Sequence, residues 1–136
     1  MNEKILIQKI INIIGNIENA TIISSYDFTD ERTSNMIVVG IDTVEQLNVN
    51  LPDYKYTVNI TIDSYIEDDK DGAIFNNIVN FVKAKINNYI NRNSALENAF
   101  QELPVVGWIN MNIQNSMTTE SNRAVITSDV IASYNY

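Results

Sequence analysis

The sequence contains neither cysteine nor histidine, and these two absences exclude many chemical mechanisms. Without cysteine there are no disulfides, no thiolate nucleophiles and none of the commonest structural zinc sites. Without histidine, the usual general base is missing, so Ser-His-Asp and Cys-His systems cannot be assembled. An enzyme built on this chain would need a carboxylate pair, a Ser-Lys arrangement or a hard metal ion held by oxygen atoms.

Basic residues are also few. The chain has 9 Lys and Arg against 17 Asp and Glu, a formal net charge of -8. Because a protein that grips a phosphate backbone needs clustered Lys and Arg, this composition disfavours tight nucleic-acid binding. An acidic surface can still face DNA without holding it, since repulsion keeps a polyanion from adhering.

Linkers and long apolar runs are absent as well. With only 4 Gly and 2 Pro, and no internal repeat, the 136 residues predict one globular domain over 1–136. No segment approaches the roughly 18 uninterrupted apolar residues of a membrane span. The apolar run of the N-terminal segment is broken by Gln8, Lys9 and Asn12, unlike that of a signal peptide. We therefore expect a soluble intracellular protein, and nothing in the sequence indicates a cofactor.

Two segments have the apolar spacing of amphipathic helices. The first is predicted over about residues 3 to 18 and the second over about 71 to 91. A capping pattern in "SALENAF", with Ser94 and Glu97, predicts a short third helix over about 95 to 102, which Pro104 ends. The two apolar stripes are Ile5, Leu6, Ile10, Ile13, Ile14 and Ile17, and Phe75, Ile78, Val82, Ile86 and Tyr89.

The remaining apolar segments are typical of strands. "TIISS" is β-branched and leads into a polar loop, and Met36 to Val44 predicts a strand covered on both faces. Pro52 and Asp53 predict a turn, and strict alternation from Tyr54 to Asp63 predicts a strand with one core face and one wet or partner-binding face. The C-terminal third alternates twice, with Ile109, Met111 and Ile113 on one face of the first run and Ala124, Ile126, Val130, Ala132 and Tyr134 on one face of the second.

These elements define the expected fold class. It is α+β, a largely antiparallel sheet packed by two main helices, in the order α-β-β-β-α-(α)-β-β.

A cluster of acids, Glu67, Asp68, Asp69 and Asp71, precedes Gly72 and the second predicted helix. A calcium EF-hand loop would require a bidentate Glu at its twelfth position, and that position falls on Ile78 of the helical stripe. We therefore predict no metal site and interpret the cluster as a strand-to-helix transition, with Asp68 or Asp71 as N-cap. A weak surface cation is the alternative.

The other candidate groups have structural interpretations. Acids at Asp27, Asp30, Glu31, Asp42 and Glu45 lie in predicted loops or strand ends, so we predict a solvated surface and no catalytic residues. Most of the aromatic residues fall in predicted strands, as is usual, and we predict that they pack in the core or at a subunit interface. Stacking on nucleic-acid bases would need interleaved cations, which the sequence lacks. These aromatic residues are Tyr54, Tyr56, Tyr65, Trp108, Tyr134 and Tyr136.

The predicted elements are, in order, an N-terminal helix, a central "YTVNITI" strand, an acidic turn into a long amphipathic helix, and then "ELPVVGWINMNIQNS" and "NRAVITSDVIASY". In this order they resemble the tail terminator or tail-completion proteins of tailed bacteriophages. The resemblance covers nearly the whole chain. It implies a structural subunit of the virion, assembled in the host cytoplasm, that forms a ring, commonly a hexamer. Such a ring caps the tail tube, stops its polymerisation, contacts the neck or connector proteins and leaves a channel for DNA.

The resemblance leaves alternatives open. A head-to-tail connector or stopper is one, and a tail-tube subunit is another, with "NMNIQNSMTTESNRAVIT" as a hairpin arm. From a different class, the chain could be a small binding module or a carboxylate-based metal-dependent enzyme, which would need at least two of Asp27, Asp30, Asp42, Asp63 and Asp69 to converge. In the ring interpretation, Glu67, Asp68, Asp69 and Asp71 are the candidate channel-facing corner.

Overall fold

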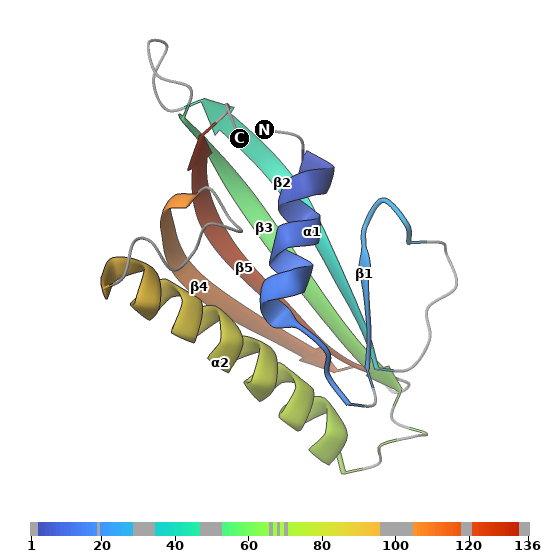
Figure 1. Cartoon of the computed structure of the whole chain (residues 1–136). Coiled ribbons are helices and arrows are strands. Elements are labelled where there is room, and N and C mark those ends of the chain that lie inside the picture. Colours follow the sequence, from blue (N-terminus) through green and yellow to red (C-terminus); the bar gives the residue numbers. More distant parts are fainter. Residues whose placement is uncertain are drawn as a thin grey trace.

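The computed structural model describes residues 3–18, 20–28, 35–46, 53–65, 67, 69, 71–95, 105–117 and 121–133. Two helices and five strands follow one another along this part of the chain (Figure 1). They are α1 (Glu3–Ile14), β1 (Thr21–Ser24), β2 (Met36–Gln46), β3 (Asp53–Tyr65), α2 (Ala73–Ala95), β4 (Val105–Met117) and β5 (Ser121–Ser133). The α+β class and the order of the main elements are confirmed. The predicted turn at Pro52 and most of the predicted third helix lie outside the described residues. Ser94, the predicted N-cap of that helix, instead lies inside α2, so this cap is wrong.

The five strands form a single mixed sheet. Their spatial order is β1-β2-β3-β5-β4, so β3 is central and β1 and β4 are the edges. Only the β1 and β2 pair is parallel; β2 with β3, β3 with β5, and β5 with β4 are antiparallel. The sheet is therefore largely antiparallel, as expected.

Both helices lie on the same face of this sheet (Figure 1). The core forms where the buried sides of the helices meet the inward-facing residues of β2, β3 and β5. Burying these side chains stabilises the fold, at roughly 25 cal/mol per Å² of apolar surface. Those below 2% exposure on the strands and helices include Leu6, Ile7, Ile10, Ile14, Ile37, Val39, Val58, Ile60, Ile62, Ile86 and Ile126. The predicted stripe of α1 is wrong at one position, because Ile5 is 47% exposed and Ile7 is buried in its place.

The ends of the helices differ from the predicted ones. Helix α1 ends at Ile14, earlier than the predicted end near residue 18. Gly15 adopts a left-handed φ of 74°, and its N–H donates a hydrogen bond to the Ile11 carbonyl at 2.9 Å. A left-handed glycine directly after a helix closes its last turn and redirects the chain. Helix α2 begins at Ala73 and continues to Ala95, past the predicted end near residue 91.

Strands β2 and β4 depart from simple alternation. On β2, Met36 to Val39 are all buried, as predicted for a strand covered on both faces, whereas the residues from Asp42 to Gln46 are exposed. The register of β4 shifts between Ile109 and Met111, which lie opposite Asp129 and Ser128 respectively. The predicted uninterrupted alternation through Ile109 and Met111 is therefore wrong, because a β-bulge inserts an extra residue between them.

We expect substitution of Gly15 by Ala to lower the free energy of unfolding by about 1–2 kcal/mol, because an L-residue with a Cβ is strained in the left-handed region. A Cβ at this position would meet nothing within 4 Å, so the loss should come from the backbone alone. Urea denaturation measures it. Gly15→Asn is the control, since Asn tolerates this conformation better and should cost less. Equal losses for both variants would contradict the explanation.

Candidate functional site

The acidic cluster before α2 organises the start of that helix. Asp69 is only 5% exposed. Its two carboxylate oxygens accept hydrogen bonds from the backbone N–H groups of Ile74, at 3.2 Å, and Phe75, at 2.8 Å. These N–H groups lie in the first turn of the helix, where no carbonyl is available to them. A carboxylate at this end also meets the positive end of the helix dipole.

Neighbouring groups complete the helix entry. The Ala73 N–H donates to Asp71 Oδ1 at 3.1 Å, and the Asn76 N–H donates to the Gly72 carbonyl at 2.9 Å. Gly72 has a φ of 73°, a conformation that favours glycine and turns the chain so that Asp69 reaches past it. The backbone N–H groups of residues 73 to 76 therefore all have acceptors.

The roles of the acids differ from those predicted. Asp71 accepts one N–H as expected. The buried acceptor of two N–H groups is Asp69, whereas the sequence pattern predicts Asp68 or Asp71 as N-cap. Asp68 lies outside the described residues, and Glu67 is exposed. An Asp placed three residues before a glycine that opens a helix is the sequence signal that could have identified Asp69.

An ion pair joins β3 to β5 near the end of β3 that leads into the acidic cluster. Asp63 is 2% exposed, and the Arg123 Nε donates to its Oδ1 at 2.7 Å. Alternation predicted Asp63 on the wet face, and by register it does lie on the face away from the helices, opposite Met36 and Arg123. It is nevertheless buried, and its charge is paired with the Arg123 guanidinium. Such a pair holds β3 and β5 in register, since an unpaired buried carboxylate is costly.

The sheet face away from the helices carries a hydrogen-bonded polar network. Thr43 donates to Thr57 at 2.9 Å, and Thr57 donates to Asp129 at 3.1 Å, which connects β2, β3 and β5. On the same face, Thr127 donates to Asn59 at 3.1 Å. These side chains satisfy one another across the strands, so this part of the face is polar and hydrogen-bonded.

The carboxylates named for an enzyme have other roles or are exposed. Asp63 is paired with Arg123, and Asp69 caps α2. Asp27 and Asp42 are exposed, and Asp30 lies outside the described residues. In the part of the chain that the structure describes, no group of three or more Asp, Glu, His or Cys could hold a metal ion.

Two of the three tyrosines of β3, Tyr54 and Tyr56, pack against the core as predicted. Tyr56 is 2% exposed, and its ring centroid lies 6.4 Å from that of Tyr54 in a tilted arrangement. Tyr65, at the end of the strand, is exposed. Trp108 belongs to β4, and Tyr134 and Tyr136 lie outside the described residues.

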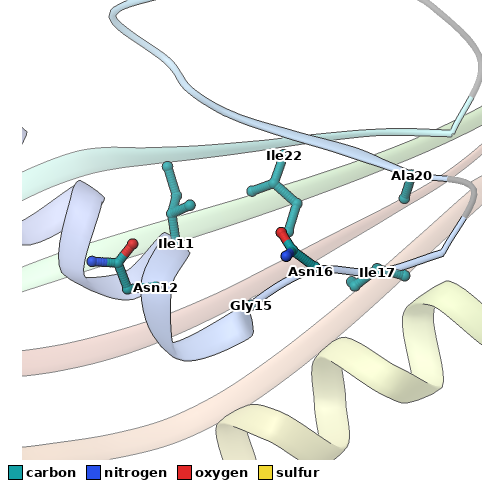
Figure 2. A pocket seen from close by; sticks show the side chains of 7 residues that line it. All are labelled: Ile11, Asn12, Gly15, Asn16, Ile17, Ala20 and Ile22. Carbon is teal, nitrogen blue, oxygen red and sulfur yellow. The ribbon is translucent and has the colours of Figure 1, made fainter.

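A hollow of about 510 Å³ opens where α1 ends and the chain turns into β1 (Figure 2). Its lining comes from the end of α1, the following segment and β1, and consists of Ile11, Asn12, Gly15, Asn16, Ile17, Ala20 and Ile22. A second hollow of about 310 Å³ shares Ile17 and is otherwise lined by Glu18 and by α2 residues that include Phe81. The first contains no acid or base, and the second contains a single carboxylate, so neither assembles an acid-base pair.

No known family model and no curated protein matches this sequence. Among the described helices, none is both long and apolar enough to span a bilayer.

We expect Asp69→Ala to lower the free energy of unfolding by about 2 kcal/mol, because two first-turn N–H groups lose a charged acceptor. Asp71→Ala should cost about 0.5–1 kcal/mol, since this exposed carboxylate accepts a single bond. Glu67→Ala is the matched control and should stay within about 0.5 kcal/mol of the unmodified chain. Chemical denaturation ranks the three, and an Asp69 variant as stable as the Glu67 control would contradict the capping role.

Tyr26 connects the loop after β1 to the start of α1. Its hydroxyl donates to Glu3 Oε2 at 2.9 Å, and the Lys4 Nζ lies 5.2 Å from the centre of its ring. The hydrogen bond to Glu3 raises the pKa of the Tyr26 phenol above its ordinary value of 10.0, with smaller contributions from burial and from repulsion by the Glu3 charge. The phenol must be protonated to donate, so the contact is present at neutral pH.

We expect the pKa of Tyr26 to fall towards its ordinary value in Glu3→Ala, as followed by NMR titration of the tyrosine ring carbons with Tyr26→Phe for assignment. Because the folded-state pKa is raised, the stabilising contribution is complete below pH 10.0 and is lost as pH rises through the raised value. Glu18→Ala removes an exposed carboxylate elsewhere and should leave Tyr26 unchanged. An unaltered Tyr26 titration in Glu3→Ala would contradict the assignment.

Proposed function

We propose that this protein is a structural subunit of a tailed bacteriophage. It is a tail terminator that assembles into a hexameric ring at the end of the tail tube. The ring stops tube polymerisation, joins the tube to the neck or connector proteins and leaves a passage for DNA. The observation that carries the proposal is the order of elements. A helix, three strands, a long helix entered through an acidic corner and two closing strands resemble this family over almost the entire chain.

The chemistry of the described side chains supports a structural role. The buried carboxylates Asp63 and Asp69 act within the fold, one in an ion pair and the other in a helix cap. The polar face of the sheet is ordered by side chains that bond to one another. Groups used in this way hold a rigid subunit in shape, which is what a ring component requires.

The acidic balance of the chain supports the passage of DNA. A net charge of -8 gives a surface that repels a polyanion, so DNA can move past it without adhering. Within the candidate channel-facing corner, Glu67 is exposed, whereas Asp69 is buried beneath the start of α2. Of the described acids in this corner, Glu67 and Asp71 are therefore the ones available to face a channel.

The hairpin expected of a tail-tube subunit has less support. Strand β5 pairs with β3 from Ser121 to Ser133 and with β4 on its other side. The described residues of the β4 and β5 hairpin therefore belong to the sheet and do not extend from it as a separate arm. This observation favours the terminator over the tube subunit.

The proposal is tested with tail tubes assembled from the tube protein of the same particle, with and without the purified chain. We expect tubes to stop elongating and to carry a ring at one end when the chain is present, because a bound ring blocks further addition. Negative-stain images give the length distribution, with an unrelated acidic protein of similar size as control. Tubes that elongate equally in both samples and carry no ring would overturn the proposal.

A further inference from the structure

The two edges of the sheet are the only described strands that lack a charged residue. Neither β1 (Thr21–Ser24) nor β4 (Val105–Met117) contains Asp, Glu, Lys or Arg. The three interior strands carry all the strand charges, which are Asp42, Glu45, Asp53, Lys55, Asp63, Arg123 and Asp129. Proteins usually do the reverse and place charges or proline on edge strands, because an exposed edge invites pairing with another chain.

Strand β4 offers a long edge. It has 13 residues and contains no proline, and among the described strands only β5 pairs with it. Its two register shifts, which locally disturb an edge, fall between Val105 and Gly107 and between Ile109 and Met111. From Met111 to Met117 the register is regular. This second half therefore presents a row of backbone N–H and C=O groups suited to another strand.

The two edges run in opposite directions. Strand β1 is parallel to β2, and three successive antiparallel pairs lead from β2 to β4. Strand β4 is therefore antiparallel to β1. If the sheet of one molecule continued into the next, β4 would meet β1 in the antiparallel arrangement, which is the more stable form of pairing.

We propose that a second copy of this chain adds its β1 edge to the β4 edge, and that repetition of this contact builds the assembly. At a net charge of -8, two copies repel each other overall, and the uncharged edges let them approach without opposing carboxylates. A contact between two different surfaces of the same protein closes into a ring or continues as a filament. The ring geometry rests on the proposed function; the pairing of edges does not.

The test places one lysine on each edge in turn. Thr21 is exposed on β1, and Gln114 lies on β4 at the register position of Val125. We expect Thr21→Lys and Gln114→Lys each to raise the protein concentration needed for assembly by about tenfold, measured by light scattering after size exclusion. Asn80→Lys, on the exposed side of α2, is the matched control and should assemble normally.

A mixture of the two variants identifies which edges meet. Each variant keeps one free edge, so an equimolar mixture should form dimers that grow no further. Assembly blocked by Gln114→Lys but unaffected by Thr21→Lys would show β4 pairing with itself and would overturn the proposal. Unchanged assembly of both variants, or an unmodified chain that stays monomeric, would also overturn it.

Cross-linking provides a second measurement that does not depend on weakening the contact. Because the chain has no cysteine, disulfides can form only between residues introduced for the purpose. Thr21→Cys is combined in turn with Asn112→Cys, Gln114→Cys or Ser116→Cys, and at least one combination should give a ladder of covalent oligomers. A ladder of oligomers without any effect on tail tubes would contradict the proposed function and leave the edge contact standing. Capping of tail tubes without any ladder would contradict the edge contact and leave the proposed function standing.

Discussion

The pairing of β3 with β5 is the interaction on which the rest of the structure depends. Thirteen residues of β3, Asp53 to Tyr65, lie opposite Ser133 to Ser121 without a register shift. This register puts Val58 and Ile60 on the helix side together with Ile126 and Ala124, and it brings Arg123 opposite Asp63. A slip of one residue would exchange the faces, bury threonine and asparagine beneath the helices and leave Asp63 without its guanidinium.

The single apolar face of the sheet explains where the helices go. Their stripes have to be buried, and the face of β3 and β5 that carries isoleucine and valine is the surface that can bury them. On the other face, Thr43, Thr57 and Asp129 bond to one another across the three interior strands, whereas Met36 and Val38 on β2 are buried there. The result is a two-layer subunit with a polar sheet surface and two uncharged edges, a form well suited to side-by-side assembly.

Much of this was predictable because it depends on neighbours along the chain. Alternation on β3 and the helical stripe from Phe75 to Ile86 identified their elements and buried faces. Boundaries were less accurate: the left-handed conformation of Gly15 stops α1 at Ile14, and the periodicity alone could not show this. The acidic cluster was recognised as a helix entry, but the choice of Asp69 depends on a turn at Gly72 that points one carboxylate at two N–H groups.

By itself, the sequence determined the class of the fold, the alternation of β3 and the absence of cysteine and histidine chemistry, because composition and short-range periodicity are properties of consecutive residues. Only the tertiary structure decided the strand order, the burial of Asp63 against a partner 60 positions away, and which strands became edges. Those outcomes depend on pairing between segments distant in the chain. The lack of charge on β1 and β4 is visible in the sequence, but it acquires meaning only when the sheet places both at its edges.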